Sequence, residues 1–94
     1  MTLNHHLYFD GGVQSVSYER DGATSSVGVM AAGEYHFGTG APERMTVVQG
    51  ELAVRLPGTT TWQSYAAGSS FEVPGDSGFD VRVAGSTSYL CEYL

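Results

Sequence analysis

The 94-residue chain contains no lysine and only four arginines, against ten acidic residues, so its formal net charge is −6. Proteins that bind nucleic acid present a basic face that neutralises phosphates. The charge balance therefore argues against nucleic acid as a partner. It still allows a small anionic ligand, because one arginine or a few backbone amides can hold a single phosphate group.

Cysteine is equally scarce. Cys91 is the only cysteine, so no disulfide can form within the chain, which favours a reducing compartment, and we expect the protein to be cytoplasmic. A domain of this length buries only somewhat more than about 60% of the surface of its unfolded chain. Small domains without disulfides often gain stability by pairing with a second copy, so we expect a homodimer.

Long apolar runs and helical patterns are also missing. The longest apolar stretch is far below the roughly 18 residues of a membrane-spanning helix. Residues 1–10 lack the basic region and the apolar run of a targeting signal. No stretch of helical length repeats its apolar residues with a period near about 3.6. We therefore expect neither a membrane partner nor a helical fold.

Glycine is abundant. Thirteen glycines separate short runs rich in Val, Thr, Tyr and Phe, a pattern typical of many strands joined by tight turns. The clearest strand is Glu51–Leu56, in which every second residue is a large apolar one. The last run, residues 87–93, places Tyr89, Cys91 and Tyr93 on one face. Each strand is therefore expected to have one face in a core.

About nine strands are expected in all. They cover residues 13–19, 25–31, 33–37, 45–48, 51–56, 61–65, 69–73, 79–83 and 87–93. Short strands at spacings near about ten residues predict an all-β sandwich or jelly-roll barrel. We place this single domain at residues 11–94 and expect residues 1–10 to be a loosely ordered N-terminal segment.

Two blocks of residues resemble the motifs of the cupin superfamily. Its first motif has two histidines flanking one residue, then a glutamate, and after six further residues a glycine. The matching positions are His36, Gly38, Glu43 and Gly50. In the second block, five residues separate Gly68 from Pro74, as at the start of the second motif. The resemblance implies an all-β, single-domain cupin of the jelly-roll β-barrel type.

Metal ligands of the cupin motifs are only partly present. Gly38 stands where the second histidine belongs, and the histidine of the second motif is missing, so only His36 and Glu43 remain of the four usual ligands. Two protein ligands rarely hold a catalytic transition metal. We therefore expect no metal and no cofactor. A metal-dependent cupin enzyme with an irregular ligand set stays open as an alternative.

Further segments resemble one branch of the superfamily, the small cupins called pyrimidine/purine nucleoside phosphorylases. They are residues 26–30, 33–35, 42–43, 45–47, 62, 65–68, 73–75 and 87–91. The resemblance runs from about Tyr8 to Leu94. It implies a glycosyltransferase that acts without metal on many purine and pyrimidine nucleosides and inorganic phosphate, giving free base and ribose 1-phosphate. A non-catalytic cupin that binds a sugar or nucleotide is the other alternative.

Such a reaction needs groups that hold phosphate, fix the ribose and help the base to leave. Glu43 is the first candidate, for ribose hydroxyls or the cationic sugar of an oxocarbenium-like transition state. His36 is a candidate donor to phosphate or to the leaving base. Asp76, in the loop after Pro74, is a candidate contact for the base or sugar. Each also has a purely structural alternative. Glu43 would be a carboxylate bonded to a turn, His36 an ordinary polar strand residue, and Asp76 an aspartate capping its own backbone.

Candidates for substrate binding fall into two groups. Arg82 or Arg44 would hold phosphate, with Thr46 as a hydroxyl alternative. However, strand alternation can also point Arg82 outward, paired with Asp80 or Glu51. Stacking surfaces for a base are offered by four aromatic residues, which are equally suited to a core. They are Phe71, Phe79, Tyr89 and Tyr93.

Overall fold

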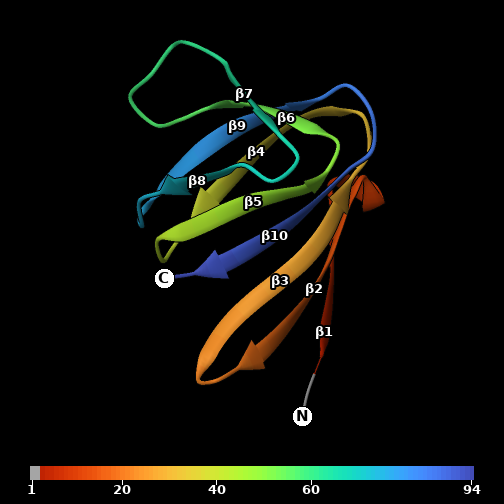
Figure 1. Cartoon of the computed structure of the whole chain (residues 1–94), viewed down its shortest axis with the longest axis vertical. Helices are drawn as coiled ribbons and strands as arrows, with labels where there is room; N and C mark the ends of the chain where they lie inside the picture. The colour runs from red at the N-terminus through yellow and green to blue at the C-terminus, as the bar shows by residue number, and fades with distance from the viewer. Residues whose placement is uncertain (1–2) are drawn as a thin grey trace.

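The computed structural model describes residues 3–94, which form ten strands and one short 3₁₀ helix (Figure 1). The elements are β1 (Asn4–Tyr8), η1 (Phe9–Gly11), β2 (Val13–Arg20), β3 (Ala23–Met30), β4 (Gly33–Thr39), β5 (Glu43–Gln49), β6 (Glu51–Arg55), β7 (Gln63–Ala66), β8 (Ser70–Val73), β9 (Ser77–Val83) and β10 (Thr87–Tyr93). In the described part of the chain, no helix is long and apolar enough to span a membrane.

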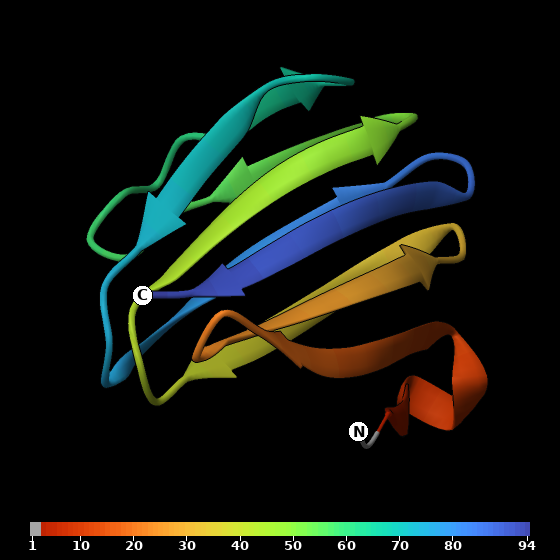
Figure 2. The ribbon, with the colours of Figure 1, turned by 60° about the horizontal axis from the view of Figure 1, so that its bottom comes forward.

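The strands form two antiparallel sheets that lie face to face (Figure 2). The larger sheet has six strands in the order β1-β2-β3-β10-β5-β8, and the smaller has four in the order β4-β9-β6-β7. The chain crosses repeatedly between the two sheets. The last strand, β10, lies in the middle of the larger sheet between β3 and β5. Residues far apart in the sequence are therefore neighbours across the sandwich.

Local turn chemistry explains where the strands reverse. The β2–β3 hairpin turns through Asp21 and Gly22, which both have positive φ (53° and 80°), the backbone geometry that two-residue hairpins favour. Between β5 and β6 the chain reverses at Gly50, with φ of 96°. A Cβ atom there would lie 2.5 Å from Thr87 Oγ1. Gly50 is therefore required both by its backbone angle and by the close approach of Thr87.

The core lies between the two sheets and consists of alternate residues from each strand. Its buried side chains are Val13, Met30, Met45, Val47, Leu52, Val54, Phe71, Val73, Phe79, Val81, Val83, Tyr89 and Cys91. Burial of one large apolar side chain stabilises the fold by about 1.5–3 kcal/mol. Because the inward positions are fixed in this way, the intervening residues of the same strands face solvent.

The nine strands expected from the sequence are all present, and the expected all-β fold is confirmed. The strands form two sheets, with no hydrogen-bonded ring that closes them into a single barrel among residues 3–94. At the N-terminus the sequence predicts no strand, yet Asn4–Tyr8 form β1, paired with β2 from Asn4↔Ser17 to Tyr8↔Val13. This strand lacks a buried face, so its sequence shows no alternation of apolar and polar residues. It is ordered because it pairs with the free edge of β2. Residues 1 and 2 of the expected loose segment lie outside the described part.

Candidate functional site

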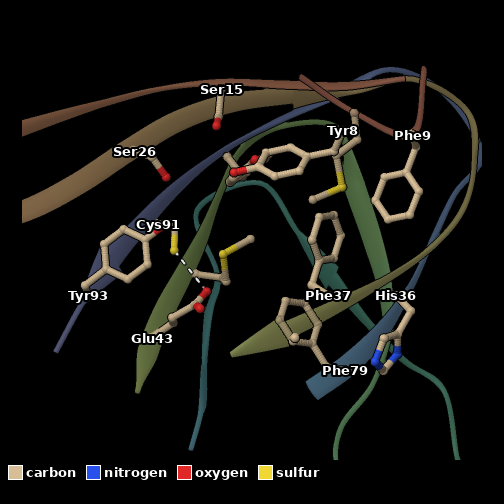
Figure 3. Close-up of a pocket in the computed structure, with 14 residues that line it drawn as sticks. Tyr8, Phe9, Ser15, Ser26, His36, Phe37, Glu43, Phe79, Cys91 and Tyr93 are labelled. Atoms are coloured by element: carbon tan, nitrogen blue, oxygen red, sulfur yellow. Dashed lines mark hydrogen bonds between the residues drawn. The ribbon is translucent and has the colours of Figure 1, made fainter. Parts of the chain in front are cut away.

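A cavity of about 220 Å³ lies between the two sheets, close to the N-terminal segment (Figure 3). Its lining residues are Tyr8, Phe9, Ser15, Ser26, Met30, His36, Phe37, Gly38, Glu43, Met45, Phe79, Tyr89, Cys91 and Tyr93. Figure 3 shows a polar group around Glu43 on one side and an aromatic group around Phe37 on the other. The six-stranded sheet supplies the polar end, and the four-stranded sheet with η1 supplies the aromatic end.

Strand pairing builds the polar end. Tyr93 of β10 stands opposite Glu43 of β5, and Cys91 stands opposite Ser26 of β3. All four side chains point to the inner face, and the Cys91 thiol donates a hydrogen bond to Glu43 Oε1 at 3.2 Å. Because β10 lies between β3 and β5, it holds a carboxylate, a thiol and hydroxyls within one small space.

The electrostatics of this end are dominated by burial. Burial raises the pKa of Glu43 above its ordinary value of 4.5, and the hydrogen bond from Cys91 partly offsets that effect. Burial and the neighbouring Glu43 charge raise the pKa of the Cys91 thiol well above its usual range, so the thiol acts here as a neutral hydrogen-bond donor. Burial also raises the pKa of Tyr93. One carboxylate among neutral donors is an arrangement suited to binding hydroxyl groups.

The aromatic end consists of three phenylalanines. Phe37 and Phe79 stack with ring centroids 5.6 Å apart, and Phe9 meets the edge of Phe37 at 5.7 Å. Phe9 comes from η1, where its backbone has a positive φ of 52°. Because its side chain is half exposed, the cavity meets solvent beside it. Flat apolar rings of this kind offer stacking surfaces to a planar ligand.

His36 lies at the aromatic end, beyond Phe37 and Phe79 in Figure 3. Its ring stays largely exposed, and Nδ1 lies 2.8 Å from Asp80 Oδ1 on the outer face of the smaller sheet. Hydrogen bonds from His36 and from Arg55 hold the pKa of the Asp80 carboxyl below its usual range. His36 therefore borders both the cavity and a second hollow outside β4 and β9.

Five residues expected at the site line this cavity: Glu43, His36, Phe79, Tyr89 and Tyr93. Asp76 does not. It occupies an exposed turn between β8 and β9 with φ of 49°, where its own N–H donates to the Gly40 carbonyl at 3.0 Å. Phe71 packs in the core against Tyr65, with ring centroids 4.7 Å apart.

The expected phosphate ligands face outward. Arg44 lies on the outside of the larger sheet beside Glu72 and Glu92, at 3.4 Å and 3.9 Å. Thr46, on the same strand, shares a 2.8 Å hydrogen bond with Ser70.

Arg82 points outward from the smaller sheet, as alternation allows. Its partner, however, is Glu34, the residue opposite it in the β4–β9 register, and neither Asp80 nor Glu51. Its guanidinium also lies over the Trp62 ring at 4.1 Å. Alternation predicts the face of the sheet, and only the register decides the partner.

The sequence alone gave no reason to choose several lining residues. Ser15, Ser26, Phe9 and Phe37 were not candidates, and Cys91 reads as a small buried apolar residue. The available signal for Cys91 was its alternation with Tyr89 and Tyr93. For the serines it was their place on the inner face of strands otherwise rich in valine. Neither signal says which strand lies opposite.

The two residues that match cupin metal ligands have different partners on the two sheets. His36 is bonded to Asp80 on the smaller sheet, and Glu43 is bonded to Cys91 on the larger one. Among residues 3–94, no group of three or more His, Cys, Asp or Glu side chains is placed to hold a metal ion. The residues present therefore do not fit the four-ligand metal site that the superfamily motif implies.

Comparisons with known proteins agree with this architecture. A protein from Shewanella frigidimarina described as an RmlC-like cupin superposes with a TM-score of 0.74 at 19% identity, covering 99% of this chain and 93% of its own. This similarity concerns the fold. A structure of an unknown function protein from Vibrio parahaemolyticus superposes with a TM-score of 0.97 at 50% identity, over 100% of both chains.

Sequence comparison identifies the family. A protein from Sorangium cellulosum called a pyrimidine/purine nucleoside phosphorylase is 60% identical over 92 residues, which cover 98% of this chain and 99% of the relative. The model of the family described as Pyrimidine/purine nucleoside phosphorylase matches residues 3–93. On these grounds, this chain belongs to the pyrimidine/purine nucleoside phosphorylase family.

Proposed function

We propose that the chain is a metal-independent nucleoside phosphorylase with broad specificity, which converts a purine or pyrimidine nucleoside and phosphate into free base and ribose 1-phosphate. The observation that carries the proposal is the two-ended cavity, with Glu43 at one end and stacked phenylalanines at the other. Typical ligand pockets measure about 300–1,000 Å³. At about 220 Å³, the cavity would enclose part of a nucleoside and leave the rest beside Tyr8 and Phe9.

The polar end suits the ribose. In phosphorolysis the bond between C1′ and the base breaks as phosphate forms a bond to C1′, and positive charge develops on the sugar. The Glu43 carboxylate would accept hydrogen bonds from ribose hydroxyls and stabilise that charge. A preorganised carboxylate in a half-buried site is more effective than the same group in water. Ser26 and Tyr93 would hold further hydroxyls.

Aromatic stacking accounts for the proposed breadth of specificity. Stacking tolerates any base, because every base has a π-face, and Phe9, Phe37 and Phe79 carry no group that reads a base edge. His36 is the polar side chain next to these rings. It would donate a proton or hydrogen bond to the leaving base or to phosphate.

Phosphate is proposed to lie on the His36 side. A dianion next to the Glu43 carboxylate would be repelled. The hollow outside β4 and β9, which His36 borders, also contains the cations of Arg55 and Arg82. Arg82 thus stays the better of the two expected arginines, because Arg44 lies on the other sheet between acidic partners.

The direct test is incubation of the purified protein with uridine or adenosine, with and without inorganic phosphate. We expect free base only with phosphate, together with an equal amount of ribose 1-phosphate, and the same rate after EDTA treatment. Nucleoside binding without turnover would support the non-catalytic alternative. Loss of activity with EDTA and its return with a transition metal would support the metal-dependent one.

A matched pair of variants tests the role of Glu43. Removing one preorganised group from a transition state costs about 10²- to 10³-fold in kcat, and we expect a loss in that range for Glu43→Gln. Glu72→Gln removes an exposed carboxylate on the outer face of the same sheet and should keep full turnover. Equal rates for the two variants would contradict a role of Glu43 in the reaction.

We also propose a cytoplasmic homodimer. The chain has one buried free thiol and no disulfide. On the outer face of the larger sheet, Val16 and Val27 stand opposite each other and remain exposed, beside exposed Val29. Covering such side chains by a second copy would stabilise a small domain. Light scattering should give twice the mass of one chain, and a single-chain mass at micromolar concentration would contradict the dimer.

A further inference from the structure

Three side chains on the outer face of the smaller sheet form a continuous hydrogen-bonded row. His36 Nδ1 lies 2.8 Å from Asp80 Oδ1, while Arg55 Nε and Nη2 donate to Asp80 Oδ2 at 3.1 Å and 2.8 Å. The strand register creates this row, because His36 and Arg55 stand directly opposite Asp80 on the two strands that flank β9. No flexible loop takes part, so the geometry is built into the sheet.

The chemistry of the row decides which nitrogen of His36 carries a proton. His36 and Arg55 hold the pKa of Asp80 below its usual range, so the carboxylate is ionised and can only accept hydrogen bonds. The guanidinium of Arg55 offers only donors and occupies Oδ2. The remaining oxygen, Oδ1, faces His36 Nδ1, which must therefore be the donor. In the neutral ring, Nε2 is then the acceptor.

The other nitrogen is left for a ligand. Within residues 3–94, no hydrogen bond is made to His36 Nε2. This side of the ring lies over Gly78, where a Cβ atom would be only 3.0 Å from both Nε2 and Cε1. The absence of a side chain at Gly78 therefore allows the ring to lie across β9 on the outer face of the smaller sheet, where His36 borders the aromatic end of the cavity.

Neighbouring charges do not compete for the ring. The remaining charged residues of the hollow, Glu34 and Arg82, bond to each other. Arg82 and Arg55 both lie over the Trp62 ring, at 4.1 Å and 4.9 Å. Each charged group of the hollow thus has a partner, and the carboxylate facing His36 is Asp80 alone.

We propose that Asp80, held in place by Arg55, is a positioning residue for His36, fixing the ring with Nδ1 protonated so that Nε2 is the nitrogen left available to the substrate. The substrate part of this statement rests on the proposed function, while the tautomer does not. When neutral, His36 Nε2 accepts a hydrogen bond. When the ring is protonated, the same nitrogen donates to phosphate or to the leaving base.

Histidine ¹⁵N NMR tests the tautomer without any assay of activity. The chain has three histidines, and the signals of His36 are those lost in His36→Gln. In the neutral ring, wild type should show a protonated Nδ1 and an unprotonated Nε2. Asp80→Ala should shift His36 towards the tautomer protonated at Nε2. Glu34→Ala, which breaks the other ion pair on the same strand as His36, should leave the ring unchanged.

Kinetics supply the second readout. General acid–base catalysis contributes about 10²- to 10⁴-fold, and we expect Asp80→Ala to lower kcat by roughly 10- to 100-fold, less than His36→Gln. Glu72→Gln, which removes an exposed carboxylate on the outer face of the larger sheet, should keep the wild-type kcat. A His36 ring protonated at Nε2 in wild type, or unchanged in Asp80→Ala, would overturn the proposal. If wild type released no base with phosphate, the proposed function would fail, and the NMR result would still decide the positioning.

Discussion

Gly28→Ala should destabilise the fold and narrow the cavity in one step. Gly28 of β3 stands opposite Tyr89 of β10, and the Tyr89 ring lies directly on the glycine. A Cβ atom at position 28 would lie 2.5 Å from Tyr89 Cζ and 2.7 Å from Cε1, far inside van der Waals contact. The ring is only 5% exposed, so its free direction is into the cavity that it lines.

The expected cost follows from overpacking of a well-filled core, about 1–3 kcal/mol. Domains of this kind are stable by about 5–15 kcal/mol, so the variant should still fold and unfold at a lower urea concentration. Urea unfolding can be followed through the fluorescence of Trp62, the only tryptophan. Displacement of the ring into the cavity should also weaken nucleoside binding.

Gly38→Ala is the matched control. Gly38 also lies within a strand and lines the cavity, yet a Cβ atom there would meet nothing closer than the Ser77 carbonyl oxygen, at 4.0 Å. In a Tyr89→Leu background, where the ring is gone, Gly28→Ala should cost far less than in wild type. Equal costs in the two backgrounds, or a Gly28→Ala variant as stable as Gly38→Ala, would refute the clash with the ring.

Two further predictions concern stability. Burial raises the pKa of Glu43, so ionising this carboxyl costs more free energy in the folded state than in the unfolded chain. The wild-type protein therefore loses folding stability as the pH rises through and above 4.5. Glu43→Gln should therefore gain stability relative to wild type between acidic and neutral pH in urea unfolding, and a constant difference across this range would contradict the buried carboxylate. Leu52 has no exposed surface, and Leu52→Ala should lower the free energy of unfolding by about 2–5 kcal/mol, measured as a lower urea midpoint. Leu3 is exposed, so Leu3→Ala should change the urea midpoint little.

Alternation with period two is a local property, and it was sufficient for most of the strands. It predicted Leu52 and Val54 as buried and Tyr89, Cys91 and Tyr93 as one face, because successive side chains of a strand point to opposite sides. Pro74 and the glycines at positions 50 and 68 marked reversals, and both glycines have positive φ. The all-β class therefore followed from the sequence pattern, whereas the family resemblance came from separate motif segments.

The first strand shows where local information ends. Asn4–Tyr8 has no buried face and no apolar pattern, and it becomes a strand because β2 offers an unpaired edge. It nevertheless brings Tyr8, and through η1 also Phe9, to the mouth of the cavity. Part of the candidate site thus comes from a segment that propensity alone would leave unstructured.

Which side chains meet was decided by the tertiary structure alone. Glu43 and Cys91 are 48 positions apart in the sequence, and His36 and Asp80 are 44 apart. Alternation places each of them on a face, but their contact depends on β10 lying beside β5 and on β9 lying beside β4. The same is true of Arg82, whose outward direction is local and whose partner Glu34 is not. The sequence determined the strands and their faces, because those depend on neighbouring residues, whereas the site arises from pairings between distant strands.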